Sequence, residues 1–117
     1  MEQSIFHLTT RSAWTAARSS GQYSADSLAS QGFIHCSSRE QVVGVANALF
    51  GGQRGLVLLE IDRSRLDSAV RFEAGTDQPG QIFPHVYGPI NLRAVVRVLD
   101  YAPGADGKFH PPSLREA

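Results

Sequence analysis

Three histidines of this chain each precede a hydroxyl side chain by two residues, inside a short segment with the pattern of a strand. The pairs are His7 with Thr9, His35 with Ser37, and His85 with Tyr87. Because strand side chains alternate between two faces, each imidazole shares a face with its own hydroxyl group. If these strands are neighbours in the fold, three imidazoles and three hydroxyls line one cleft. The spacing therefore predicts a polar pocket built around histidine.

Imidazole suits such a pocket because its ordinary pKa, about 6.5, lets it donate or accept a proton near neutrality. Glu73 lies on the polar face of its strand together with Arg71, and it is either a surface charge or a carboxylate that faces the pocket. Each histidine also has a simpler interpretation, in which it satisfies buried polar groups of the fold. His110, near the C-terminal end, is expected to face solvent.

Other side chains are candidates for ligand contacts. Trp14 and Tyr23 are either core residues or an aromatic wall for a planar ligand. Ser38 and Arg39 open a helix, where unpaired amides and the added positive charge attract anions, although most helix starts bind only water. With the hydroxyl partners of the histidines, the predicted ligand-binding residues are Thr9, Trp14, Tyr23, Ser37, Ser38, Arg39 and Tyr87.

Metal binding and nucleophilic catalysis are two alternatives to a histidine-lined ligand pocket. Three histidines and a water form a recognised catalytic zinc site, but these histidines lie far apart in the sequence and include no close pair. Cys36 follows His35 directly, and adjacent strand residues point to opposite faces, so the two cannot act together. We assign no metal ligand and expect the Cys36 thiol to pack in the core.

The composition narrows the class of protein. The chain has 117 residues with 11 basic and 11 acidic side chains, so no charge excess points to nucleic acid or to a membrane surface. The longest apolar run, Leu56 to Leu59, is too short to span a bilayer, and the N-terminus has no signal-peptide pattern. A single cysteine excludes an internal disulfide. We expect a cytoplasmic protein whose partner is a small molecule.

Strands and helices are mixed without regular alternation, which favours a small α+β domain with a mixed or antiparallel split sheet and two main helices. Residues 1–102 form this domain, and residues 103–117, rich in Pro, Gly and charge, are expected to be a loosely ordered tail. Strands are predicted at 4–9, 33–37, 56–61, 70–74 and 95–101, and helices at 10–19 and after Ser37-Ser38. A loop is expected at 75–81, followed by an edge or irregular strand at 83–87 because of Pro84 and Pro89.

The chain resembles the bacterial family catalogued as domain of unknown function 952 (DUF952). The resemblance covers about residues 4–101 and depends on Trp14, Tyr23, Glu73 and three motifs, Ile-Phe-His-Leu-Thr at 5–9, Gly-Phe-Ile-His-Cys-Ser at 32–37 and Phe-Pro-His-Val-Tyr-Gly-Pro at 83–89. That family is similar at fold level to ADP-ribosyltransferases, in which a small split α+β sheet surrounds an NAD-binding cleft. The resemblance implies an ADP-ribosyltransferase-like fold and a nucleotide or NAD-like substrate.

The same resemblance implies roles for individual residues. His7 matches the first-strand residue that holds a ribose hydroxyl, and the segment Phe33 to Ser37 matches the one that flanks the nicotinamide. The usual glutamate of the third element is absent from residues 87–89, and Glu73 is the carboxylate that could replace it from a neighbouring strand. The predicted catalytic residues are His7, His35, Glu73 and His85, with His35 and Ser37 as the cleft floor and Tyr87 orienting the ligand.

Three hypotheses follow. In the first, the protein binds a nucleotide-like or phosphorylated small molecule and transfers or hydrolyses at an N-glycosidic bond, with NAD as a substrate rather than a resident cofactor. In the second, the protein is a non-catalytic binding or structural module whose histidines are structural. In the third, the histidines hold a metal ion.

Overall fold

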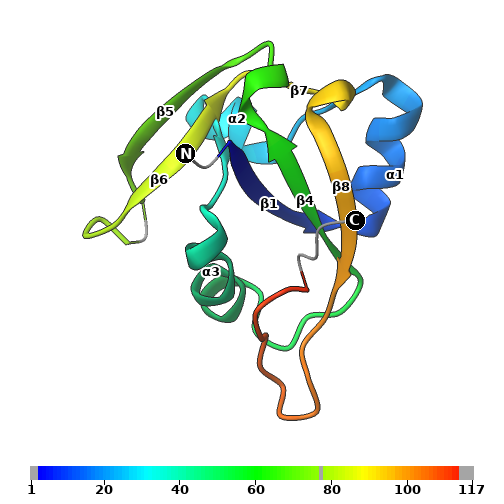
Figure 1. Ribbon diagram of the computed structural model, residues 1–117, viewed down its shortest axis with the longest axis vertical. Helices are drawn as coiled ribbons and strands as arrows, with labels where there is room; N and C mark the ends of the chain where they lie inside the picture. Colours follow the sequence, from blue (N-terminus) through cyan, green and yellow to red (C-terminus); the bar gives the residue numbers. More distant parts are fainter. Residues whose placement is uncertain (1–2, 77, 114–117) are drawn as a thin grey trace.

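A computed structural model describes residues 3–76 and 78–113, and within them the strands form three small antiparallel sheets (Figure 1). The first sheet has the order β1-β4-β8 and the second the order β3-β6-β5, while β2 and β7 form a two-stranded ladder. Their bounds are β1 (Ser4–Thr10), β2 (Gln22–Tyr23), β3 (Ile34–His35), β4 (Leu56–Asp62), β5 (Ala69–Ala74), β6 (Ile82–Tyr87), β7 (Ile90–Asn91) and β8 (Val95–Tyr101). The predicted α+β class and the antiparallel pairing are confirmed.

The helices are α1 (Arg11–Ser20), α2 (Asp26–Gln31) and α3 (Val42–Leu49), with 3-10 turns η1 (Arg39–Gln41), η2 (Arg63–Arg65) and η3 (Leu92–Ala94). Helix α1 begins as its sequence predicts, because the Ala13 amide donates to the Thr10 hydroxyl at 3.1 Å. Gly21 ends α1 with a φ of 96°, a left-handed conformation that favours glycine. Among the described residues, the short helix α2 is present in addition to the two main helices that were predicted.

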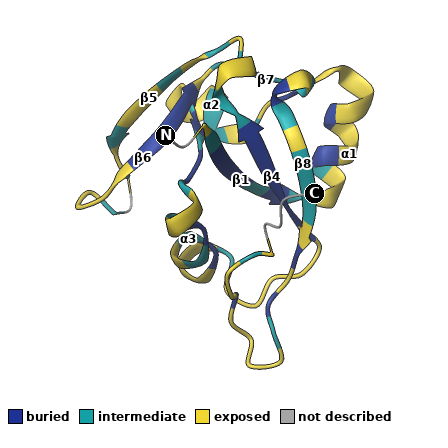
Figure 2. Ribbon diagram, viewed as in Figure 1, coloured by how far each residue is buried: buried dark blue, intermediate teal, exposed yellow. Residues whose placement is uncertain are grey.

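Strand β4 is the centre of the core and is buried from Leu56 to Ile61 (Figure 2). Its alternate side chains serve two separate clusters. Val57 and Leu59 pack with residues of β1, α1 and the second sheet, and Leu58 packs on the other face with Phe6 and residues of α3. The sheet is thus covered on both sides, as a strand with apolar residues on both faces requires.

A backbone bridge between Phe6 and Ser37 joins the two larger sheets. The Phe6 amide donates to the Ser37 carbonyl at 2.8 Å, and the Ser37 amide donates to the Phe6 carbonyl at 2.7 Å. In the second sheet His35 of β3 is paired directly with His85 of β6. The three histidine segments, distant in sequence, are therefore neighbours in the fold.

Strand β6 differs from the prediction, because it is the middle strand of its sheet and not an edge or irregular strand. The reason lies in the orientation of Pro84. The Cys36 amide donates to the Pro84 carbonyl at 3.1 Å, so that side of Pro84 faces β3. The amide and carbonyl of one strand residue point to the same side, so the missing N–H of Pro84 faces the end of β3, beyond the last paired residue His35, and the pairing with β5 is intact.

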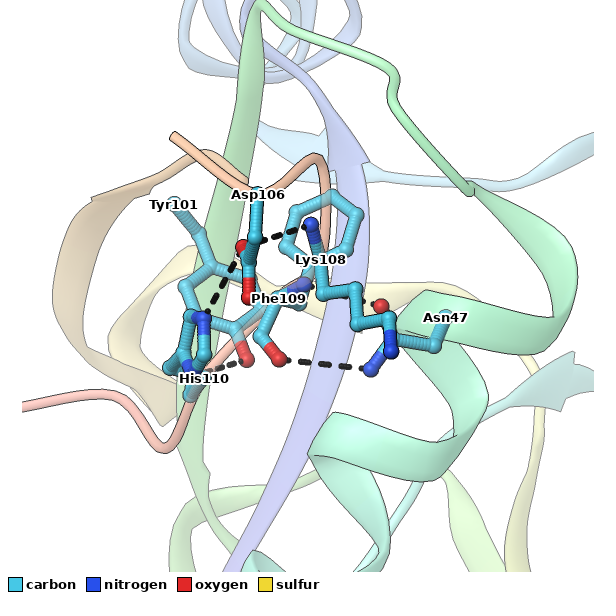
Figure 3. A network of polar contacts seen from close by, with 6 residues as sticks. All are labelled: Asn47, Tyr101, Asp106, Lys108, Phe109 and His110. Carbon is cyan, nitrogen blue, oxygen red and sulfur yellow. Dashed lines mark hydrogen bonds and ion pairs between the residues drawn. The ribbon is translucent and has the colours of Figure 1, made fainter. Parts of the chain in front are cut away.

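The segment after β8, predicted to be a loosely ordered tail, has no helix or strand as far as residue 113 but makes side-chain contacts with the rest of the fold. Phe109 is only 2% exposed, and its ring centroid lies 5.0 Å from that of Tyr101. The side chain of Asn47 accepts from the Phe109 amide at 2.8 Å and donates to its carbonyl at 3.2 Å (Figure 3). His110 is mostly exposed, as expected, beside Asp106. Residues 114–117 lie outside the described part, and so does Asp77 in the predicted 75–81 loop.

Within the described ranges no helix combines the length and apolarity needed to cross a membrane.

Candidate functional site

A pocket of about 220 Å³ lies between β1, the segment around β3, helix α3 and the end of the β5–β6 hairpin. Most of its wall is apolar, with side chains such as Phe6, Val45, Phe50 and Phe83. The polar residues in the wall are His7, Ser27, His35, Ser37, Thr76 and Gln78. Three predicted site residues, His7, His35 and Ser37, are thus brought to one cavity, whereas His85 is not part of its wall.

His35 joins this pocket to a second group of side chains on the same face of the β3-β6-β5 sheet. The ring centroids of His35 and His85 lie 5.4 Å apart at an angle of 75°. Nδ1 of His85 lies 2.8 Å from Oε1 of Glu73, and the Tyr87 hydroxyl donates to the same oxygen at 2.7 Å. We refer to Glu73, His85 and Tyr87 as the Glu73 cluster. It arises because directly paired and alternate residues of antiparallel strands share a face.

Hydrogen bonding sets the charge of this cluster. The bonds from Tyr87 and His85 lower the pKa of Glu73, so this group is a carboxylate at neutral pH. The same carboxylate raises the pKa of Tyr87, whose hydroxyl keeps its proton. Because Oε1 can only accept, Nδ1 of His85 carries a hydrogen. Oε2 of Glu73 accepts no hydrogen bond from the residues that the structure describes.

His85 is 2% exposed, and its Nε2 is buried without a hydrogen-bond partner among the described residues. Phe33 covers the ring, with the two centroids 4.0 Å apart and the planes inclined by only 16°. The Phe33 ring also touches His35 and Tyr87, at centroid distances of 4.9 and 5.4 Å. Phe33 shares the strand face of His35 and is therefore a site residue, although it is not among the predicted catalytic or ligand-binding residues.

His7 lies on the opposite side of the site, in a chain of buried polar contacts. Its Nδ1 is 2.6 Å from the carbonyl oxygen of His35, and its Nε2 is 2.8 Å from the Tyr23 hydroxyl. That hydroxyl is in turn 2.9 Å from the Thr9 hydroxyl. Burial lowers the pKa of His7 to about 4, so the ring is neutral at pH 7.

This neutrality fixes the direction of the hydrogen bonds. The His35 carbonyl can only accept, so Nδ1 of His7 donates and Nε2 accepts from Tyr23. The Tyr23 hydroxyl is also placed to donate to the Thr9 hydroxyl, so its single hydrogen is shared between Nε2 of His7 and Thr9. Both ring nitrogens of His7 are used inside the fold, which differs from the expected role of holding ligand hydroxyl groups. His7 instead positions the backbone of His35.

The remaining predicted contacts do not gather at the pocket. Trp14 is buried in the larger apolar cluster of the core and does not line the pocket, which favours the core interpretation of its ring. Ser38 forms a capping box with Gln41 at the start of η1. Arg39 lines a separate hollow beside the tail, so the expected anion site at this helix start is not part of the pocket.

Cys36 is buried, and burial raises the pKa of its thiol, which leaves it protonated and packed in the core as expected. In the described ranges there is no group of three or more His, Cys, Asp or Glu side chains placed to hold a metal ion. The hypothesis of a histidine-bound metal therefore has no ligand set in this part of the chain.

Comparison with known proteins identifies the family. The family described as "Protein of unknown function (DUF952)" matches residues 8–98, which include His35, Phe83 and the Glu73 cluster. The chain belongs to the DUF952 family. No curated protein matches the chain.

Solved structures extend this DUF952 match to nearly the whole chain. The crystal structure of protein CC0527 from Caulobacter crescentus is 37% identical, with a TM-score of 0.79, and the match covers 92% of this chain and 93% of that one. The solution NMR structure of CC0527 is 33% identical with a TM-score of 0.77, and covers 92% and 91% of the two chains. The chain is therefore similar to CC0527 in both sequence and fold.

Proposed function

We propose that this DUF952 protein binds an NAD-like nucleotide and cleaves its N-glycosidic bond. The observation that carries the proposal is the double position of His35, which forms part of the pocket wall and also lies 5.4 Å from the ring of His85 in the Glu73 cluster. His35 therefore contacts both the pocket and the Glu73 cluster of carboxylate, imidazole and phenol groups. Strongly interacting groups of this kind beside a cavity are typical of functional sites.

The pocket suits the base of such a ligand. Ligand pockets usually measure about 300–1,000 Å³, so a volume of about 220 Å³ fits a ring-sized group rather than a whole nucleotide. Its wall is mainly apolar and, among the described residues, includes no lysine or arginine, so no permanent positive charge there opposes the cationic nicotinamide ring. The sugar and phosphates would then lie outside, over the face that carries the Glu73 cluster.

Glu73 has the properties needed at the sugar. Cleavage of an N-glycosidic bond develops positive charge on the anomeric carbon and ring oxygen, and a nearby carboxylate stabilises that charge. Glu73 is ionised, its orientation is fixed through Oε1, and its Oε2 accepts no bond from any described residue. This carboxylate takes the place of the glutamate that residues 87–89 lack.

The hydrolytic step balances with these groups alone. The bond between the anomeric carbon and the nicotinamide nitrogen breaks, and its electron pair leaves on that nitrogen to give neutral nicotinamide. Water adds to the anomeric carbon, and the proton it loses passes to the Glu73 carboxylate and then to solvent. His85 and Tyr87 hold Glu73 in place, and His35 at the pocket wall hydrogen-bonds the leaving base or the attacking water.

The experiment is an assay of NAD hydrolysis by chromatographic detection of free nicotinamide. The purified protein should release nicotinamide, and Glu73→Gln should lower the rate roughly 100-fold or more while keeping the fold. Glu40→Gln, an exposed glutamate on η1, is the matched control. Equal release by wild type and Glu73→Gln would refute the catalytic proposal. Binding of ADP-ribose without any release would reduce the function to the non-catalytic alternative.

A further inference from the structure

Arg71 is a cation next to the Glu73 cluster that no predicted role includes. It is the direct cross-strand partner of His85, so both side chains lie on one face of the sheet. Its guanidinium carbon lies 5.1 Å from the centroid of the Tyr87 ring, a cation–π contact that holds the exposed side chain over this face. Arg71 forms no ion pair with any carboxylate of the described residues.

The positions on this face follow an order. Along β5 the pocket residue Gly75 follows the end of the strand, Glu73 comes next on this face opposite Phe83, and Arg71 comes after it opposite His85. If the proposed function holds, a ligand with its base in the pocket and its sugar at Glu73 extends its next group toward Arg71. Among the described residues the pocket wall has no lysine or arginine, so Arg71 is the permanent cation on this face of the sheet.

We propose that Arg71 binds the 5′-phosphate of the ligand, so that the substrate class is a nucleotide and not the corresponding nucleoside. An arginine suits this task because its planar guanidinium donates two parallel hydrogen bonds to phosphate oxygens. The inference rests on the proposed function, since it takes the sugar to lie at Glu73. It assigns to Arg71 the anion binding that the sequence pattern placed at Arg39.

The test uses two ligands that differ only in the phosphate. These are the carbocyclic analogue of nicotinamide riboside and its 5′-phosphate, in which a methylene replaces the sugar ring oxygen so that no oxocarbenium ion can form. Wild-type protein should bind the phosphate about tenfold more tightly than the riboside analogue, by calorimetry at low salt. Arg71→Gln should remove this preference and leave the riboside affinity unchanged, while Arg71→Lys should retain part of it.

Arg93→Gln is the matched control, because Arg93 is an exposed arginine on η3 with no ion pair among the described residues. It should leave both affinities unchanged. Added salt should weaken the preference of wild type but not the riboside affinity. If both ligands bind wild type and Arg71→Gln alike, the phosphate subsite is wrong and the proposed function stands. If wild-type protein binds neither analogue, the proposed function fails and this inference fails with it.

Discussion

Nδ1 of His7 lies 2.6 Å from the carbonyl oxygen of His35, so the imidazole of one histidine segment fixes the backbone of another. The two rings have different surroundings as a result. Both residues line the pocket, but both ring nitrogens of His7 are engaged inside the fold, whereas Nε2 of His35 lies 3.2 Å from Oε1 of the exposed Gln31. A structural histidine and a site histidine thus meet at one carbonyl group, and the structural one holds the other in position.

The first prediction concerns pH. The pKa of His7 is about 4 in the folded protein and about 6.5 in the unfolded chain, so the unfolded chain binds the extra proton between these values. The stabilisation is complete above pH 6.5 and is lost as the pH falls from about 6.5 to 4. The loss in unfolding free energy is about 3 kcal/mol. Urea unfolding at pH 7, 5.5 and 4 measures it.

The matched variants for this prediction are His7→Gln and His110→Gln. His7→Gln should make the unfolding free energy nearly independent of pH between about 6.5 and 4.5. His110→Gln should leave the pH dependence as in wild type, because His110 is exposed. Carboxylates with lowered pKa values, such as Glu73 and Asp106, add their own loss below about pH 4.5 in every variant. Superimposable profiles for wild type and His7→Gln would contradict the assignment of the proton to His7.

The second prediction concerns the segment after β8. Phe109→Ala should lower the unfolding free energy by about 3 kcal/mol, because the ring is buried against Tyr101. Asn47→Ala should cost about 1–2 kcal/mol, since it removes two hydrogen bonds to Phe109. Lys108→Ala, an exposed neighbour, should change stability by no more than about 0.5 kcal/mol. Losses below that level for Phe109→Ala would mean that the segment is not anchored.

The local parts of this fold could be predicted because short-range physics determines them. Thr10 and Gly21 mark the two ends of α1 through capping and a left-handed φ, and neither effect depends on distant residues. The run from Leu56 to Ile61 is apolar at every position except Glu60, which already indicates a strand covered on both faces. The alternation of strand side chains also placed His85 and Tyr87 on one face, but it left open whether Glu73 faces the pocket or solvent.

The parts that could not be predicted depend on contacts between distant segments. Whether Pro84 disrupts a sheet depends on where the neighbouring strand β3 ends, and nothing local to Pro84 contains that information. The structural role of His7 depends on its contact with the carbonyl of His35, which lies 28 residues away in the sequence. Phe109 is a single apolar residue among prolines, glycines and charges, so its burial depends on a gap beside Asn47 and Tyr101 that the fold provides.

The third prediction concerns the charge of the proposed catalytic carboxylate. The hydrogen bond from the Tyr87 hydroxyl is the largest cause of the lowered pKa of Glu73, and the bond from His85 comes second. Tyr87→Phe should therefore raise the pKa of Glu73 toward its ordinary value without removing the His85 contact. If ionised Glu73 is the active form, the acid side of the pH–rate profile moves upward in the same direction.

Carbon-13 NMR of the Glu73 carboxyl group across a pH titration measures this shift directly, without any ligand. Tyr101→Phe is the control, because its hydroxyl donates to the His110 carbonyl and makes no contact with Glu73. An unchanged Glu73 titration in Tyr87→Phe would show that Tyr87 does not set the charge of the carboxylate. A shifted titration with an unshifted pH–rate profile would separate Glu73 from the chemistry, because the activity would then be insensitive to the state of the group proposed to stabilise the transition state.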